Sequence, residues 1–330
     1  MAANFSPQKN ARKAKPFVCK EQHIAINDLK IKDEIKHRHM YKTYLLKDIP
    51  EYPSPVEFHI TEVAHVTNKT SLEKIWNSGG FKGLDTDSFS WWSLKINEAD
   101  IRAAEERYLE KLFPDMTKEE KTVHPPFLRE FTTSPLFLNE LSRYGNFRFT
   151  FPVNELMETY KKQKCEGQEP ILRIYGTKLF SQEIEYVVLV HSPEFNWKFG
   201  HFPLLKSSPW VAYDGHQIIW KAQAICETHN FQLVIRGGTA VTEYMPSHQF
   251  YVWDHVSLVF HSKDVLTVPQ RKLKGSLSCC ELDRDVDLSN GKNCSFDEAE
   301  KFIKSLPDDE SEKEDEKEEY KSVEVKMEMD

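Results

Sequence analysis

VEFHITEVAHVTNKTSLEKIWNSGGFKG, residues 56–83, is the stretch that decides the fold. In its first half apolar residues occupy most even positions and polar residues most odd positions, a period of two that predicts a strand. The exceptions are Glu62 and Val63. We expect the even face to be buried and the odd face, which carries His65 and Thr67, to be open for chemistry.

The second half of the same stretch predicts a short helix. Residues 68–71 include three side chains that can cap a helix N-terminus, and Leu72, Ile75 and Trp76 follow as an apolar stripe at helical spacing. Gly79 then favours the left-handed backbone that ends a helix. The unit is a strand followed by a helix of about two turns.

Further strands follow along the chain. YGNFRFTF at 144–151 and EIEYVVLVH at 183–191 alternate with period two, which makes Val188 and Val190 core residues, and a hairpin is expected about Asp214 and Gly215. We predict an α+β fold, with a mainly antiparallel, split or curved sheet of about seven or eight strands and about three or four short helices.

The 330 residues divide into three parts. Residues 1–50 form a basic N-terminal extension in which Leu29, Ile31 and Ile35 could share one face of a short helix. Residues 51–278 form a single globular α+β domain. Residues 279–330 form an acidic, largely disordered tail, because the apolar pattern fades there.

Charge is concentrated at the end of the chain. Residues 308–330 hold 12 acidic and 4 basic residues, a net charge of −8 that equals the charge of the whole chain. The remaining body is formally neutral, which argues against a general nucleic-acid binder. The sequence shows neither an apolar run long enough for a membrane span nor a signal peptide, so we expect a cytoplasmic protein, with the nucleus as the alternative.

Histidine and cysteine patterns predict no metal site. Cys226 and His229 are the one close pair, and zinc ligands usually come as two such pairs. The six cysteines include no C-x-x-C pair, which favours reduced thiols. The sequence also lacks the glycine-rich phosphate loops and the G-x-S-x-G elbow of serine hydrolases.

Three short motifs resemble the ADP-ribosyltransferase fold, including its poly-ADP-ribose-polymerase-like branch. His65-Val66-Thr67 is similar to the family's first-strand His followed two residues later by Ser or Thr, although the family often has Gly where Val66 stands. Glu183, which opens EIEYVVLVH, is similar to the catalytic Glu of a later strand, with Glu185 as its rival. Tyr144, two residues after Ser142, is similar to the family's intermediate tyrosine.

The resemblance implies an NAD-dependent transferase that modifies a protein or nucleic-acid target. Glu183 would stabilise the positive charge that develops on the ribose when the nicotinamide bond breaks, and His65, the second catalytic residue, would hydrogen-bond the ribose and orient the sugar. Thr67 would hold the ribose and Tyr144 would stack on nicotinamide, so that NAD is the expected cofactor substrate.

A second class of function stays open. The overall organisation also resembles uncharacterised vertebrate proteins, some of them induced by viral infection, a resemblance that names no activity. In that class the domain is a non-catalytic interaction module with a protein partner, in an antiviral or innate immune response. Its binding surface would be formed by tryptophans: Trp91, Trp92, Trp210, Trp220 and Trp253.

Overall fold

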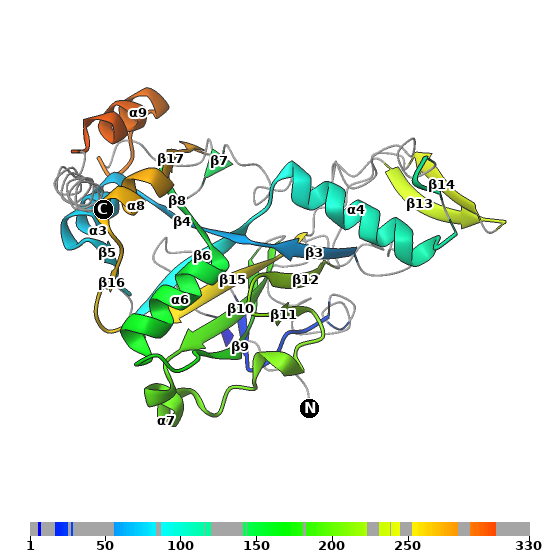
Figure 1. Cartoon of the computed structure of the whole chain (residues 1–330), viewed down its shortest axis with the longest axis horizontal. Coiled ribbons are helices and arrows are strands. Elements are labelled where there is room, and N and C mark those ends of the chain that lie inside the picture. The colour runs from blue at the N-terminus through cyan, green and yellow to red at the C-terminus, as the bar shows by residue number, and fades with distance from the viewer. Residues whose placement is uncertain are drawn as a thin grey trace, which may run out of the picture.

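The structure is a computed structural model that describes residues 6–7, 17–25, 28, 56–83, 87–115, 117–119, 141–142, 144–180, 183–222, 231–237, 239–244, 253–282 and 291–307. The α+β class with a mainly antiparallel sheet is confirmed (Figure 1). The helices of these residues are α3 (Lys69–Ser78), α4 (Glu98–Leu112), α6 (Val153–Lys164), α7 (Asn196–Phe199), α8 (Gln270–Ser276) and α9 (Phe296–Ser305).

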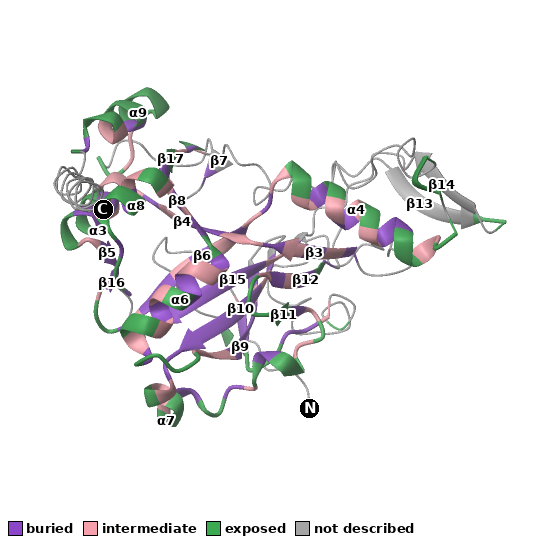
Figure 2. Cartoon of the chain, in the orientation of Figure 1, coloured by how far each residue is buried: buried purple, intermediate pink, exposed green. Residues whose placement is uncertain are grey.

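A nine-stranded sheet forms the centre of the molecule. Its strands, in spatial order, are β1 (Ser6–Pro7), β2 (Phe17–Lys20), β9 (Ile171–Phe180), β10 (Glu183–His191), β15 (Trp253–His261), β6 (Phe89–Lys95), β4 (Glu62–Thr67), β8 (Phe147–Pro152) and β17 (Leu277–Cys279). Within this nine-stranded sheet, β10 and β15 are the one parallel pair, and all other neighbouring strands are antiparallel. These two strands are buried along most of their described length (Figure 2).

Smaller sheets flank the main one. The three-stranded sheet contains β11 (Val211–Tyr213), β12 (Ile218–Ala222) and β3 (Val56–Ile60), and its β11–β12 pair is the expected hairpin about Gly215. The two-stranded sheets are β13 (Phe231–Arg236) with β14 (Thr239–Tyr244), β5 (Gly80–Phe81) with β16 (Leu266–Thr267), and β7 (Leu141–Ser142) with β18 (Glu281–Leu282).

The stretch that was expected to be one strand is two. β3 and β4 are separated at Thr61, whose carbonyl accepts a hydrogen bond of 2.8 Å from the backbone N–H of Val153. The break moves the chain from the small sheet into the main one and shifts the alternation by one residue. Val63 is therefore fully buried, and His65 is on the same face. The expectation that His65 and Thr67 share a face is confirmed, but that face is directed at the core.

Helix α3 follows as predicted. The side chain of Asn68 caps its N-terminus by accepting from the backbone N–H of Ser71, at 3.0 Å. Gly79 ends it with φ of 69°, a left-handed conformation that favours glycine. Leu72, Ile75 and Trp76 are buried, as the helical stripe indicated.

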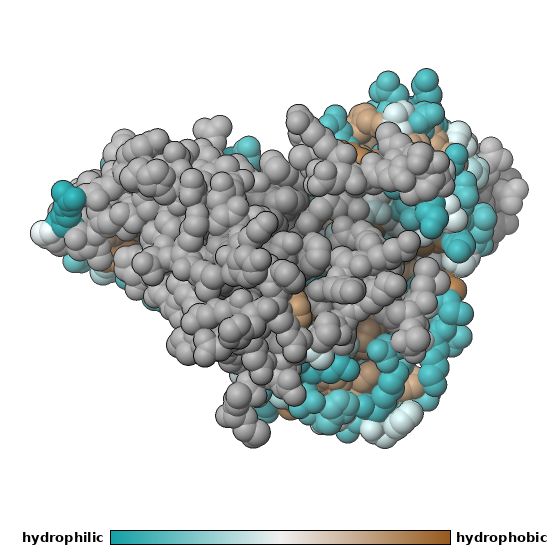
Figure 3. Space-filling model, turned by 180° about the vertical axis from the view of Figure 1, so that it is seen from behind, coloured by the Kyte–Doolittle hydropathy of each residue, from teal (hydrophilic) through white to brown (hydrophobic). Residues whose placement is uncertain are grey.

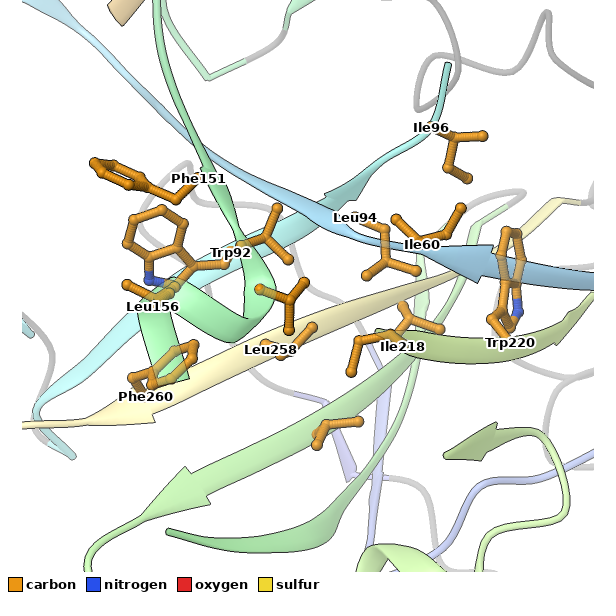
Figure 4. Packing of buried hydrophobic residues seen from close by; sticks show 14 of the residues in the cluster. Ile60, Trp92, Leu94, Ile96, Phe151, Leu156, Ile218, Trp220, Leu258 and Phe260 are labelled. Atoms are coloured by element: carbon orange, nitrogen blue, oxygen red, sulfur yellow. The ribbon is translucent and has the colours of Figure 1, made fainter. Parts of the chain in front are cut away.

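One face of the main sheet carries the large hydrophobic core. Trp92, Phe151 and Leu258 pack there, and the core continues through Ile60 to Trp220 in the small sheet (Figure 4). A second, smaller core covers part of the opposite face of the main sheet, and its members are Phe89, Tyr175, Val187, Leu189, Phe199, Phe202 and Val259. Phe199 and Phe202 come from the segment around α7, so this segment covers the smaller core.

The packed domain extends beyond the expected boundaries at 51 and 278. Upstream, Val18 and Ile24 are buried within residues 17–25, which add β2 to the sheet. Downstream, Ala299 of α9 and Leu306 join the main core, because α9 has an apolar stripe that packs on the sheet. The expected helix around Leu29–Ile35 and the acidic residues 308–330 lie outside the described residues.

Candidate functional site

His65 is partly buried and packs against the buried rings of Phe81 and Trp92. Its Nδ1 donates to the carbonyl of Trp91 at 2.8 Å, and its ring lies 5.3 Å from the rings of both Phe81 and Trp92. Burial lowers the pKa of His65, although the hydrogen bond to Trp91 opposes the shift. The imidazole is therefore neutral at pH 7 and has the surroundings of a core residue.

Thr67 and Tyr144 lie near each other at the end of β4. A Cβ atom added to Gly145, which follows Tyr144, would meet the carbonyl oxygen of Thr67 at 2.1 Å, so the two backbones touch. Thr67 is buried, whereas Tyr144 is 56% exposed. His65, Thr67 and Tyr144 thus lie near the same end of β4.

Glu183 is far from these three residues. The strand register places Ala64 of β4 level with Val187 of β10, with β6 and β15 between them. Position 183 is therefore four residues and three strand spacings from Ala64, a separation of about 20 Å. The side chain of Glu183 lies outside the described part of the chain.

The two carboxylate candidates also differ from His65 in the face that they occupy. Glu185 is on the same face of the sheet as Val187, a member of the smaller core, whereas His65 faces the large core. Position 183 has the same parity in β10 as Glu185. The structure thus separates the predicted catalytic His from both predicted carboxylates.

Glu185 belongs to a different cluster of polar side chains. Its carboxylate is 3.5 Å from the ammonium of Lys178, and that ammonium lies 3.4 Å from the centre of the Trp91 ring. Burial raises the pKa of Glu185, but Lys178, His255 and a hydrogen bond from Ser257 outweigh it, so the net shift is downward. Glu185 is therefore an ionised carboxylate that is paired with Lys178.

The tryptophans expected to form a binding surface are mostly internal. Trp92 and Trp220 are buried, Trp91 and Trp210 are partly exposed, and the side chain of Trp253 lies outside the described residues. The large indoles instead fill the cores, because they offer the most apolar surface to bury. The expectation of a surface built from these five residues is therefore wrong for Trp92 and Trp220.

Among the described residues, the most exposed aromatic side chain belongs to a different tryptophan. Trp197, in α7, is 79% exposed. It belongs to residues 192–208, which connect β10 to β11 and which we call the strap. The described surface that is visible from behind is mainly hydrophilic, with hydrophobic residues in separate spots (Figure 3).

A buried arginine ties the strap to the sheet. Arg173 on β9 donates to the carboxamide oxygen of Asn196 at 2.6 Å and to the carbonyl of Phe202 at 2.6 Å. Its Nε donates to Nε2 of His191 at 2.9 Å. Sequence reasoning missed this cluster, although one arginine inside the apolar strand ILRIY was a signal of it.

Metal ligands do not converge in the part of the chain that the structure describes. Within it, no group of three or more His, Cys, Asp or Glu side chains could hold a metal ion. Cys226 and His229, the one close pair in the sequence, lie outside it. Of the described cysteines, Cys19, Cys165, Cys279, Cys280 and Cys294 are all free thiols.

Comparisons with known proteins add no relative. No family model, no curated protein and no solved structure matches the chain. None of the described helices is long and apolar enough to cross a membrane.

Proposed function

We propose that the protein is a non-catalytic interaction module that binds a protein partner through Trp197. The observation that carries the proposal is the 79% exposure of this indole on a strap that is otherwise held firmly. Residues on both sides of Trp197 are fixed: Asn196 by Arg173, and Phe199 by burial in the smaller core. A rigid, exposed tryptophan is a typical anchor of protein interfaces, because little entropy is lost when it is covered.

The separation of His65 from Glu183 and Glu185 favours this function over an NAD-dependent transferase. Such an enzyme needs the ribose-binding His and the carboxylate in one site, since the carboxylate must act on the ribose that the His orients. About 20 Å of sheet lies between Ala64, next to His65, and position 183. The exposed indole needs no such convergence.

The catalytic alternative is tested by incubating the purified protein with labelled NAD. We expect no release of nicotinamide and no label on protein or nucleic acid, for the wild type and for Glu183→Gln and Glu185→Gln alike. Turnover by the wild type that either substitution abolishes would overturn the proposal, because a carboxylate that acts in the transition state affects turnover more than binding.

The interface itself is tested with a photo-crosslinking amino acid. The residue p-benzoylphenylalanine replaces Glu194, an exposed strap residue three positions before Trp197, in one variant and His216, an exposed residue of the β11–β12 turn, in the matched control, so that Trp197 itself is kept. In cells we expect discrete protein adducts from position 194 alone. Excess untagged wild type should compete them away, whereas Trp197→Ala should not. Equal adducts at both positions, or equal competition by both proteins, would contradict the proposal.

A further inference from the structure

Three buried histidines hold the strap, and the first is His191 at its start. Arg173 donates to Nε2 of this ring, so Nε2 must carry a lone pair. The proton is then on Nδ1, which donates to the carbonyl of Ser192 at 2.8 Å. Protonation would remove the acceptor and place two cations in contact within a buried cluster.

His23, on the chain just after β2, holds the other end of the strap. Its Nε2 donates to the carbonyl of Val187 at 3.2 Å, which leaves Nδ1 to accept from the hydroxyl of Ser208 at 2.8 Å. The Ser208 oxygen already accepts from the backbone N–H groups of Trp210 and Val211. The bond to His23 therefore needs a neutral imidazole, because a second N–H would face an oxygen that is already occupied.

His261 lies under the middle of the strap. Its ring centre is 4.3 Å from that of Phe195 and 4.9 Å from that of Phe199. The residue is 1% exposed, and its Nδ1 has no hydrogen-bond partner among the described residues. A charge on this ring would be buried against aromatic carbon.

The charges around these rings disfavour protonation. In addition to burial, Lys198 of the strap, His191 and Lys263, just after β15, lower the pKa of His261, whereas Asp87, 3.6 Å from Lys198, opposes the shift. Burial is the main cause that lowers the pKa of His191, and the charge of Arg173 lowers it further. Burial also lowers the pKa values of His23 and His261, each to about 4.

Two other described groups packed around the strap have pKa values that burial raises. Tyr160 of α6 donates to the carbonyl of His261 at 2.6 Å, and burial raises its pKa. Burial likewise raises the pKa of Cys165 to about 11, although a hydrogen bond with Ser192 opposes the shift. Glu194 is exposed on the strap itself.

We propose that the strap is an acid-released latch: protonation of His23, His191 and His261 detaches residues 192–208 while the large core stays folded. Release uncovers the smaller core, whose aromatic members on the sheet are Phe89 and Tyr175. The latch is a property of the free chain and does not depend on a partner at Trp197.

The direction of the pH effect follows from linkage. In the released strap each histidine returns to an ordinary pKa of about 6.5, so the released form binds protons more readily than the latched form. The histidines stabilise the latched form relative to the released form fully above a pH of about 6.5. This stabilisation is lost as pH falls towards about 4. Each histidine raises the ratio of released to latched molecules by up to about tenfold per pH unit in that window.

Hydrogen exchange at pH 7.5 and pH 4.5, corrected for the intrinsic pH dependence of exchange, tests the latch. We expect protection of the strap amides to fall by about 100-fold or more, from the effect of at least two histidines over one pH unit or more. Residues 256–260 of β15, at the centre of the sheet, should stay protected. Loss of protection in both regions at the same pH would mean global unfolding and would overturn the proposal.

Variants separate the histidines from other acid effects. His191→Gln keeps an acceptor for Arg173 and a donor for Ser192, and His261→Phe keeps an aromatic ring beside Phe195. Neither can titrate, so the midpoint of release should move about one pH unit or more lower in the double variant. The matched control is His201→Gln, an exposed histidine of the same strap, which should leave the midpoint unchanged.

The outcome stays decisive if a substitution damages the fold. Should the double variant fail to fold at pH 7.5, His261→Phe alone should still lower the midpoint, because the ring it replaces makes no hydrogen bond through Nδ1 among the described residues. An unchanged midpoint in His261→Phe, or an equal shift in His201→Gln, would overturn the latch.

Discussion

Arg173 shows how a buried charge can be held by neutral groups. Its guanidinium contacts the ring of His191, the carboxamide of Asn196 and the carbonyl of Phe202, and burial lowers its pKa. Hydrogen bonds to a charged donor are stronger than those between neutral groups, which offsets part of the desolvation. The strap and the sheet are therefore coupled through one side chain.

Substitution of Arg173 should weaken the fold substantially. Arg173→Met removes the donor and leaves the three acceptors buried without it, so we expect a loss of about 2–4 kcal/mol in the free energy of unfolding. Urea denaturation at pH 7.5 measures it. The control is Arg102→Met on α4, where the side chain is 73% exposed and the loss should stay within about 0.5 kcal/mol. Equal losses would mean that Arg173 does not hold the strap.

The two faces of the main sheet can be distinguished by one substitution on each. Val188 is fully buried in the large core, so Val188→Asp should destabilise the protein by about 3 kcal/mol or more as an unpaired buried charge. Thr150 on β8 is partly exposed, and Thr150→Asp should cost about 1 kcal/mol or less. Thermal melting compares the two variants, and similar losses would contradict the assignment of faces.

At the scale of elements, α9 is the part of the chain most readily mistaken for a tail. Asn146 explains its attachment: its side-chain nitrogen donates to the carbonyl of Cys294 at 2.8 Å, and its side-chain oxygen accepts from the same residue at 3.0 Å. Ser295 then caps the helix, in a capping box with Glu298. The segment is fixed before α9 begins.

Truncation tests this attachment. A chain that ends at residue 307 should have the urea midpoint of the full chain. A chain that ends at residue 280 loses the buried Ala299 and Leu306 and leaves Asn146 unpaired, so it should lose about 3 kcal/mol or more. The same midpoint for both truncated chains would show that the domain ends near 280 after all.

The periodicity of the sequence predicted where strands and helices form better than it predicted which residues pack against them. The strand-to-helix unit of residues 56–83 could be predicted because caps and alternation are local signals. The role of His65 could not, since the break at Thr61 depends on a hydrogen bond from Val153, far along the chain. Val63, an apolar residue at an odd position, was the local signal of the shifted phase. The α9 capping box was also readable, but its packing on the core was not.

At the scale of the whole molecule, both faces of the sheet contain histidines whose pKa burial lowers. The ring of His65 contacts Trp92 of the large core, and His191 and His261 lie beside the smaller one. Buried imidazoles resist protonation, because the charged form loses more hydration than the neutral form. Acid should therefore weaken the whole molecule as well as the strap.

Global stability should decline as pH falls, and His65 allows a clean measurement of one contribution. Its pKa is lowered in the folded state, so the folded chain binds fewer protons than the unfolded chain. The contribution of the His65 imidazole to the free energy of unfolding is complete above the unfolded pKa of about 6.5. It is lost as pH falls below that value, by up to about 1.4 kcal/mol per pH unit.

The substitution His65→Asn tests this contribution, because asparagine can still donate to the Trp91 carbonyl but cannot titrate. Urea unfolding free energies at pH 7 and pH 5 should therefore differ less in His65→Asn than in the wild type. His216→Gln, at an exposed position, should keep the wild-type difference. A wild-type pH dependence in His65→Asn would show that the imidazole is charged in the fold or reaches solvent, and would reopen His65 as a chemically active residue.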